Sequence, residues 1–146
     1  LDGDGNLDLV LLQNVMNTTS TLSADGSPVV GLNGPSVACA SLPVNVTGFF
    51  LTSQTQGLVT AVPGSVGTLC LGARIGRLVG AGGIQNSGAA GVFQLDVDLT
   101  VMPDPQLGFV AAQPGETWSF QAWHRDVLPM GGATSIFSSE LSVELR

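Results

Sequence analysis

Apolar and polar residues alternate along much of this chain. In VFQLDVDLTVM (92–102), every second residue from Phe93 to Val101 is apolar. Successive side chains of a strand point to opposite faces of a sheet, so the alternation predicts a strand with one face in a core and the other in solvent. SSELSVELR (138–146) repeats the pattern and predicts a closing strand.

The segment LDLVLLQNV (7–15) differs because it is almost continuously apolar. A run of this length is typical of a strand that is buried on both faces or paired with another subunit. Shorter runs rich in β-branched and aromatic residues predict further strands at 36–43, 47–53, 57–62, 68–79 and 117–127. A PGSVG turn at 63–67 is expected to join two of them into a hairpin.

Turn-forming residues separate these runs, and no segment has a convincing helical pattern. GAGGIQNSGAAG (80–91) and PDPQLGFVAAQPGE (103–116) are rich in Gly, Ala or Pro and are expected to be a loop and a long turn region. About eight to nine short strands with frequent turns predict an all-β protein, an antiparallel, jelly-roll-like β-sandwich, with a barrel as the competing architecture. We place a loop remnant and an N-terminal strand at 1–15 and the sandwich domain at 16–146.

The composition supports this fold class and limits the partners. Charged residues make up 10% of the chain, Gly occurs 20 times and Pro 8 times. The net charge of -7 would repel phosphate backbones and anionic lipid surfaces, so we expect no nucleic-acid partner. No apolar stretch approaches the roughly 18 residues that a membrane span requires, so we expect no membrane insertion.

Cys39 and Cys70 are the only cysteines. No CxxC spacing or nearby His supports a zinc site, so we expect a Cys39–Cys70 disulfide. In the chain-entropy model such a bond would stabilise the fold by roughly 3 to 4 kcal/mol. Disulfides persist in oxidising compartments, which favours a secreted or cell-surface protein.

The opening sequence LDGDGNLDLV (1–10) sets Asp2, Asp4, Asn6 and Asp8 at alternate positions with Gly between them. Oxygen ligands that converge from a tight loop suit Ca²⁺, which takes roughly six to eight of them. The stretch resembles the Asp-rich calcium loops of FG-GAP or VCBS-type repeats, commonly written DxDGDGxxDL, in which the loop leads directly into a strand. The first Asp of that loop is missing here, so the alternative is a solvated turn that binds no metal tightly.

A second resemblance runs from about Cys39 to the end of the chain. It rests on GFFLTSQTQG, GTLCLGARIGRL, IQNSG and, most specifically, PGETWSFQAWHRD followed by SSELSVEL. These segments resemble an uncharacterised C-terminal domain of large secreted or surface proteins of planctomycetes and myxobacteria, in which the block is usually PGxTxxFQxWYRD. The resemblance implies an extracellular β-sandwich. His124 stands where that group usually has Tyr.

His124 is the only histidine and is followed by Arg125 and Asp126. It could act as a general base held by Asp126, but a hydrolase also needs a nucleophile and an oxyanion hole, and no GxSxG pattern is present. Arg125 and Asp126 are better explained as a structural ion pair or a turn-anchoring network. We therefore expect no catalytic residues and no enzyme.

Asp96 and Asp98 lie two residues apart on one face of the predicted strand 92–102. Their spacing of about 6.5 to 7 Å would suit the paired carboxylates of a glycosidase. A flat solvent-facing sheet provides neither the cleft nor the raised pKa that this chemistry requires. We expect two solvated carboxylates.

Trp118 and Trp123 have opposite parity on the strand 117–127, so one is expected in the core and the other exposed or covered by a loop. An exposed Trp flanked by Gln121 and Arg125 can stack on a sugar ring, and the alternative is a second layer of packing. Gln121, Trp123 and Arg125 are therefore the candidate ligand surface.

These features predict a non-enzymatic, extracellular structural or adhesive domain. The apolar strand 7–15 favours self-association or assembly with other surface-protein subunits, because such a strand can complete a neighbour's sheet. The alternative function is a carbohydrate-binding module whose partner is a polysaccharide. Calcium is the one cofactor expected.

Overall fold

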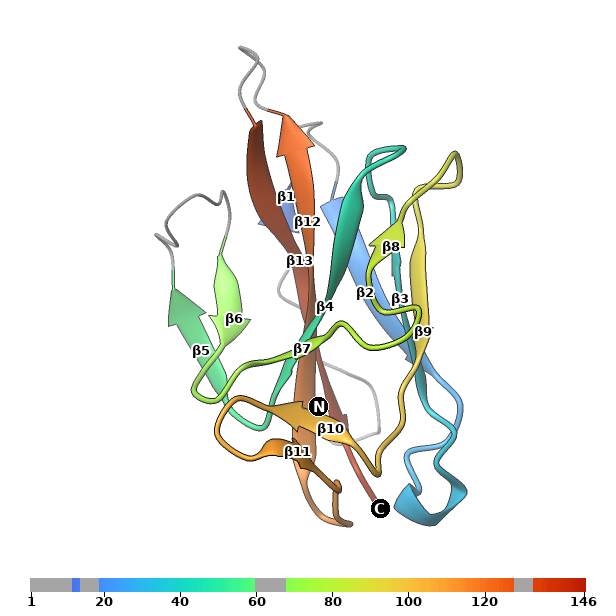
Figure 1. Cartoon of the computed structure of the whole chain (residues 1–146), viewed down its shortest axis with the longest axis vertical. Coiled ribbons are helices and arrows are strands. Elements are labelled where there is room, and N and C mark those ends of the chain that lie inside the picture. The colour runs from blue at the N-terminus through green and yellow to red at the C-terminus, as the bar shows by residue number, and fades with distance from the viewer. Residues whose placement is uncertain (1–11, 14–18, 60–67, 128–132) are drawn as a thin grey trace.

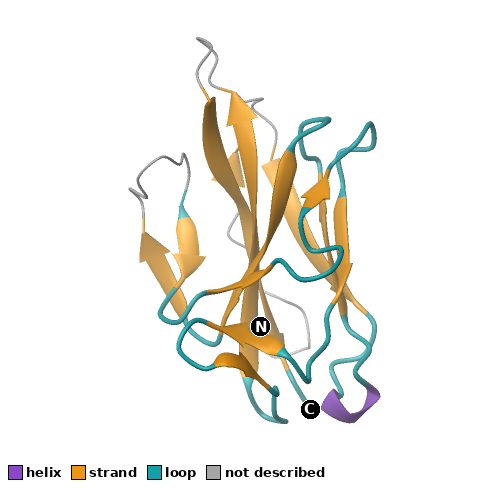
Figure 2. Cartoon of the chain, in the orientation of Figure 1, coloured by secondary structure: helices purple, strands orange, loops and turns teal. Residues whose placement is uncertain are grey.

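The computed structural model describes residues 12–13, 19–59, 68–127 and 133–146. Nearly all of their regular structure is strand, and the one helix in these ranges is the short 3-10 turn η1, Val30–Leu32 (Figure 2). The all-β prediction is confirmed. The strands are β1 Leu12–Gln13, β2 Thr19–Asp25, β3 Ser36–Ala40, β4 Thr47–Ser53, β5 Gln56–Val59, β6 Leu69–Leu71, β7 Gly76–Leu78, β8 Gln85–Asn86, β9 Phe93–Asp96, β10 Met102–Asp104, β11 Gly108–Val110, β12 Thr117–Val127 and β13 Ala133–Glu144.

Two antiparallel sheets form the body of the protein (Figure 1). One sheet has the strand order β1-β2-β3-β9, and the other has the order β13-β12-β4-β7, with β8 also paired with β4. The hairpins β5-β6 and β10-β11 form separate two-stranded sheets. In the view of Figure 1, β5-β6 stands at the left and β10-β11 crosses the bottom.

The main core lies between the two larger sheets. Trp118, Phe120 and Ala122 of β12 all face this core, because side chains two apart on a strand share a face. Phe50 of β4 and Phe93 of β9 meet there edge to face, with ring centroids 6.3 Å apart. Burying each large apolar side chain stabilises the fold by roughly 1.5–3 kcal/mol.

A second apolar cluster lies on the outer face of the sheet that contains β12. Leu51, Leu71 and Phe137 are buried in it, and the half-buried Trp123 packs against them. Leu71 belongs to β6, so the β5-β6 hairpin covers this face. With Trp118 in the core and Trp123 on the outer face, the predicted opposite parity of the two tryptophans is confirmed.

A bulge between β12 and β13 adjusts the register of the longest strand pair. The register shifts between Gln121 and Trp123, so Ser138 and Ser139 of β13 have no ladder partner in β12. The Ser138 hydroxyl accepts a hydrogen bond from the Ala122 N–H at 2.8 Å. The Ser139 hydroxyl accepts one from the Leu22 N–H of β2 at 2.9 Å. The bulge therefore links the two sheets through a side chain.

Several strand predictions are wrong in their boundaries. In the segment 92–102 the predicted strand covers only Phe93–Asp96, because the ladder with β3 ends where Pro35 has no N–H to donate, and Met102 already belongs to β10. The segment 68–79 divides into β6 and β7, which join different sheets. The predicted turn region 103–116 contains the β10-β11 hairpin. The described residues form 13 strands rather than eight to nine, because several strands are only two or three residues long.

The predicted Cys39–Cys70 disulfide is wrong. Both cysteines are free and buried. Cys39 lies on β3 and faces the main core, whereas Cys70 lies on β6, which covers the outer face of the other sheet. The sheet that contains β12 separates the two thiols, so no disulfide forms without rearranging the sandwich.

Candidate functional site

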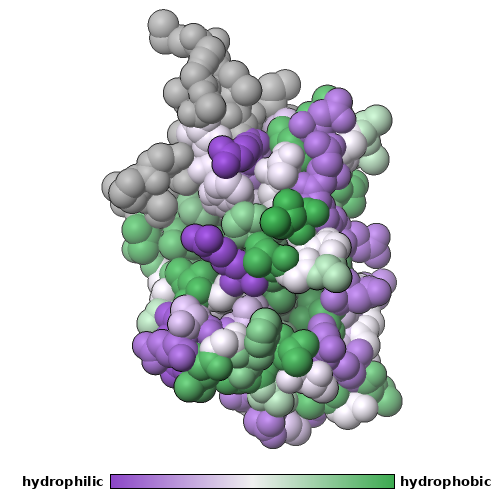
Figure 3. Space-filling view, in the orientation of Figure 1, coloured by the Kyte–Doolittle hydropathy of each residue, from purple (hydrophilic) through white to green (hydrophobic). Residues whose placement is uncertain are grey.

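A groove with a volume of about 370 Å³ lies at the open side of the sandwich, between the edge strands β7 and β9. The β10-β11 hairpin closes one end of it. In the space-filling view, apolar side chains gather where β7 and this hairpin cross (Figure 3). The groove lining includes apolar residues from all of these elements, among them Leu78, Val79, Leu95, Val101, Pro103 and Phe109.

The groove has a buried apolar floor and an exposed apolar rim. Leu78 and Leu95 are partly buried and pack against the main core, so the floor continues that core to the surface. At the rim, Phe109 is 67% exposed and Val101 is 49% exposed. An aromatic side chain exposed to this extent beside a hollow is typical of a ligand-binding site, since it provides a flat contact surface at little entropic cost.

The edge of β9 is partly covered by one side chain. The Gln85 carboxamide accepts a hydrogen bond from the Gln94 N–H at 2.9 Å and donates one to the Gln94 carbonyl at 2.8 Å. The side chain therefore occupies the place that a neighbouring strand would take. This arrangement protects the sheet edge at Gln94.

Asp96 is the next residue of β9 whose main-chain N–H and C=O point to the same side as those of Gln94. In an antiparallel ladder, alternate residues direct both main-chain groups toward one neighbour. Gln94 bonds to Gln85 on the outer side, and the Val97 N–H bonds to the Pro35 carbonyl on the inner side. The N–H and C=O of Asp96 therefore point outward, where Asp96 lines the groove.

Asp96 and Asp98 both line the groove and are both exposed, as predicted for solvated carboxylates, but only Asp96 belongs to a strand. Asp98 lies beyond the end of β9, and its Oδ1 accepts hydrogen bonds from Thr100 Oγ1, Thr100 N and Asn33 Nδ2 at 2.6, 3.0 and 3.0 Å. These bonds lower the pKa of Asp98, and the two from Thr100 contribute most. Asp98 is therefore ionised at neutral pH.

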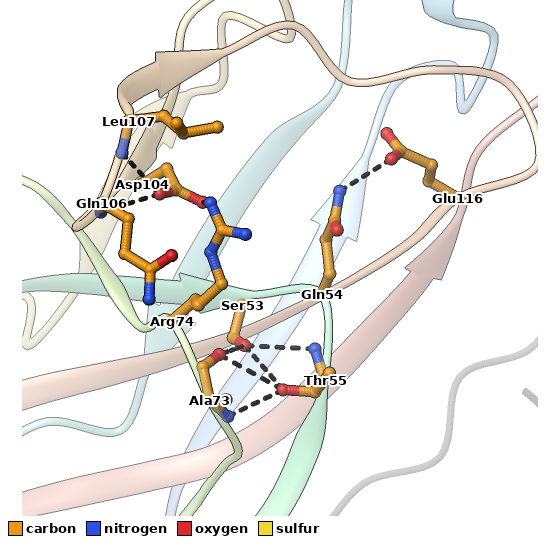
Figure 4. Close-up of polar contacts among 9 residues, drawn as sticks. All are labelled: Ser53, Gln54, Thr55, Ala73, Arg74, Asp104, Gln106, Leu107 and Glu116. Carbon is orange, nitrogen blue, oxygen red and sulfur yellow. Dashed lines mark hydrogen bonds and ion pairs between the residues drawn. The ribbon is translucent and has the colours of Figure 1, made fainter.

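An ion pair holds the hairpin that carries Phe109. Asp104 Oδ2 lies 2.7 Å from an Arg74 guanidinium nitrogen, and Asp104 Oδ1 accepts hydrogen bonds from the N–H groups of Gln106 and Leu107 (Figure 4). The carboxylate thus joins the turn of the hairpin to the chain before β7. Hydrogen bonding to Arg74 is the main reason why the pKa of Asp104 falls from its usual 3.8 to about 2.

Neighbouring contacts fix the segments on either side of this ion pair. The Ser53 and Thr55 hydroxyls both donate to the Ala73 carbonyl, and Gln54 Nε2 donates to Glu116 Oε2 at 2.7 Å (Figure 4). Gly76 lets β10 approach β7 closely, since a Cβ at that position would clash with the Pro103 carbonyl oxygen. The end of the groove is therefore formed by two closely packed strands.

The predicted ligand surface of Gln121, Trp123 and Arg125 lies on the other side of the β12 sheet, with its three side chains on one face. Gln121 is fully buried beneath β6. Arg125 is exposed, and its guanidinium lies over the Trp123 ring, 5.6 Å from the ring centroid. Phe49 packs against the same tryptophan with a centroid separation of 5.0 Å. A sugar stacking on Trp123 would compete with these neighbours.

The Gln121 amide is engaged within the fold. Its Oε1 accepts from the Cys70 N–H at 2.9 Å, and its Nε2 donates to the Thr68 and Ser138 carbonyls at 2.9 and 2.8 Å. Next to it, the buried Glu140 accepts hydrogen bonds from Ser142 and Gln56. These bonds attach the β5-β6 hairpin to the sheet beneath it, so the position of Gln121 fits a structural role.

The other predicted residues provide no metal or catalytic centre in the described structure. His124 is buried, and its Nδ1 lies 3.0 Å from the Arg125 carbonyl, which can only accept, so that nitrogen carries the proton. The side chain of Asp126 and the four calcium residues Asp2, Asp4, Asn6 and Asp8 lie outside the described residues. Within residues 19–59, 68–125 and 134–146, no group of three or more His, Cys, Asp or Glu side chains could hold a metal ion.

Phe109 and Gln85 were not predicted as site residues, since both fall in segments expected to be turns or loops. One local signal was present for Phe109: Asp104 followed by Gly108 is typical of a short hairpin connection, and Gly108 has a φ of 84°. No local signal marks Gln85, because its role depends on β9 lying beside it in the fold.

Comparison of the chain with protein-family models, curated proteins and solved structures finds no match in any of the three. A search of the described residues for a helix long and apolar enough to cross a membrane finds none. The function is therefore inferred from the chemistry of the groove.

Proposed function

We propose that this chain is a non-enzymatic, extracellular adhesive domain that holds its ligand in the groove between β7 and β9. One observation carries the proposal: the groove joins an apolar floor to an exposed aromatic residue, Phe109, on a hairpin that the Arg74–Asp104 ion pair holds. Small-ligand sites combine mostly apolar walls with a few polar groups in this way. The role in adhesion and the extracellular location are inferred from the resemblance to surface-protein domains.

Two variants test whether ligand binding depends on the groove. The labelled domain is applied to an array of polysaccharides and extracellular matrix proteins, beside Val101→Arg and Leu32→Ala. Val101→Arg places a long charged side chain at the rim, whereas Leu32 is 69% exposed on η1 and serves as the matched surface control. We expect Val101→Arg to lose any specific binding by at least about tenfold, and Leu32→Ala to keep it. Equal binding by all three proteins would contradict a role for the groove.

Assembly by strand addition is a second candidate function. One observation favours it: β13, Ala133–Glu144, is 12 residues long and forms one edge of its sheet. The proposed donor strand is 7–15, of which Leu12 and Gln13 pair with Ser20 and Thr19 of the same chain. The other residues of that strand lie outside the described ranges.

Light scattering and negative-stain microscopy, with and without a calcium chelator, test the assembly candidate. Ordered oligomers that dissociate on chelation would support both strand addition and calcium binding by Asp2, Asp4, Asn6 and Asp8. A monodisperse monomer that is indifferent to the chelator would contradict both.

A further inference from the structure

We propose that the groove binds a neutral sugar unit that carries an N-acetylamino group, and that the main chain of Asp96 recognises the amide. This inference rests on the proposed function, since it assumes that the groove is the ligand site. It names the ligand class and the groups that select it.

The side chain of Gln85 shows how the edge of β9 binds an amide. Its carboxamide shows that an amide can lie against the edge of β9, with one hydrogen bond in each direction to Gln94. Asp96 presents the same pair of outward main-chain groups two residues further along, within the groove lining. An acetamido group has one N–H and one C=O, so it can make the same two bonds there.

The free edge of β9 has room for a single amide but not for an extended peptide. Gln85 already covers the β9 edge on one side of Asp96. On the other side β9 ends, and Asp98 begins a turn through its bonds to Thr100. Only one outward-facing residue of β9 is therefore available. A peptide that added a full strand would need several such residues.

The apolar lining of the groove suits the rest of such a sugar. Leu78, Leu95 and Pro103 provide an apolar floor that suits the acetyl methyl group, and the exposed Phe109 ring at the rim suits the apolar face of a pyranose. The groove volume of about 370 Å³ lies near the lower end of the roughly 300–1,000 Å³ typical of small-ligand sites. It therefore suits one or two sugar units.

The charge of the groove limits the ligand further. Two carboxylates, Asp96 and Asp98, and one guanidinium, Arg77, line it, so its local charge is negative, as is the net charge of -7 of the chain. Carboxylates accept hydrogen bonds from hydroxyl groups, but they repel carboxylated or sulfated sugars. The combination favours a neutral N-acetylhexosamine over an acidic sugar.

Three probes that differ in one group test the ligand class by titration calorimetry. These are the β-1,4-linked trimer of N-acetylglucosamine, the glucose trimer of the same linkage, which has hydroxyl in place of acetamido, and N-acetyl-dialanine methylamide as a peptide. We expect the first to bind and the second to bind at least about tenfold more weakly, because a site built for an amide leaves its polar groups unpaired with the analogue. The peptide is expected not to bind measurably.

Substitutions at one position test the role of the main chain. Asp96→Pro removes the outward N–H, which is not used in the ladder with β3, and Pro is tolerated at a sheet edge for that reason. Asp96→Ala removes the carboxylate and keeps the N–H. We expect Asp96→Pro to weaken binding of the N-acetylglucosamine trimer by about tenfold and Asp96→Ala by no more than about threefold. Phe109→Ala should also weaken it by about tenfold, and Leu32→Ala should not.

If Asp96→Pro fails to fold, the amide signal of Asp96 in a nitrogen–proton correlation spectrum provides the second measurement. It should shift on addition of the N-acetylglucosamine trimer and stay unchanged with the glucose trimer. Equal affinity of the two trimers, both lost in Phe109→Ala, would overturn the amide assignment and leave the proposed function standing. Binding of the peptide alone would overturn the sugar assignment. If nothing binds the groove here or on the array, the proposed function fails as well.

Discussion

At the scale of single residues, buried polar side chains in this protein replace main-chain partners. Gln121 makes three hydrogen bonds beneath β6, all to backbone groups. Ser138 and Ser139 do the same at the bulge, where each hydroxyl accepts from a backbone N–H. The sequence pattern marks these positions as polar members of strands. It does not show that they are buried, because their burial depends on β6 and β2, which are distant in sequence.

Gln121→Ala should be strongly destabilising. The substitution leaves the Cys70 N–H and the Thr68 and Ser138 carbonyls short of a partner in a buried layer. We expect the free energy of unfolding to fall by roughly 2 to 4 kcal/mol, measured by urea denaturation. Gln94→Ala is the control, since that side chain is exposed, and it should change stability by less than about 0.5 kcal/mol. Equal effects of the two variants would show that the amide network contributes little.

The Asp104–Arg74 ion pair predicts a dependence of stability on pH. The pKa of Asp104 is lowered to about 2 in the folded protein, against a usual 3.8. The stabilisation is therefore fully present above about pH 4 and is lost as the pH falls through about 2. Asp104→Asn should be less stable than the wild type at pH 5, and the difference should shrink steadily between pH 4 and pH 2.

Urea midpoints measured across that range test the assignment. Glu144→Gln, at an exposed position on β13, controls for the loss of one negative charge. If Asp104→Asn and Glu144→Gln follow the same pH profile, the ion pair has no specific effect on stability.

At the scale of elements, the alternation of apolar residues predicted strand faces better than strand lengths. In 92–102 the buried residues Phe93, Val97 and Leu99 follow the predicted parity, although the hydrogen-bonded strand ends at Asp96. The parity is wrong where β10 begins, because Val101 is exposed and Met102 is buried. Periodicity reports which side chains are buried. The extent of a strand depends on its neighbour, here on Pro35, which is distant in sequence.

The candidate site was only partly predictable for the same reason. Asp96 and Asp98 were singled out from spacing, but their place beside a groove depends on where β7 and β10-β11 lie. Phe109 is an isolated aromatic residue in a Gly- and Pro-rich segment, and only the hairpin places it at the rim. The Cys39–Cys70 prediction failed because an even number of cysteines does not determine which side of a sheet each one faces.

Gln85→Ala should expose the edge of β9. The Gln94 N–H and carbonyl would lose their partners and bond to water instead. We expect the Gln94 amide to exchange with solvent at least about tenfold faster in hydrogen-exchange NMR, and the free energy of unfolding to fall by about 1 kcal/mol. Gln106→Ala, at an exposed position in the β10-β11 turn, should leave exchange at Gln94 unchanged. Unaltered exchange in Gln85→Ala would contradict the protective role.

At the scale of the whole molecule, the two free thiols report on different opening events. Burial raises the pKa of Cys39 to about 12, and burial followed by the charge of Glu140 raises the pKa of Cys70. Neither thiol forms much reactive thiolate at neutral pH in the folded protein. Cys39 lies in the main core, whereas Cys70 lies in the β5-β6 hairpin on the outer face of the β12 sheet.

Alkylation with iodoacetamide in increasing urea, followed by mass spectrometry, should therefore give two rates. Cys70 should react first, as β5-β6 detaches, and Cys39 only with global unfolding. A reducing agent should change neither rate, because no disulfide is present. Identical rates for both cysteines would show that the hairpin does not open independently. A protein mass two units lower than that of the dithiol would show that the cysteines do form a disulfide.

The close crossing of β7 and β10 has a consequence for how such a domain can diverge. Gly76 has no room for a side chain, so a lineage that keeps this hairpin must keep glycine there. The rim is under no such constraint, since Val79, Val101 and Phe109 are exposed and lie in or beside short connections. Descendants can therefore exchange rim residues, and with them the preferred ligand, on an unchanged scaffold.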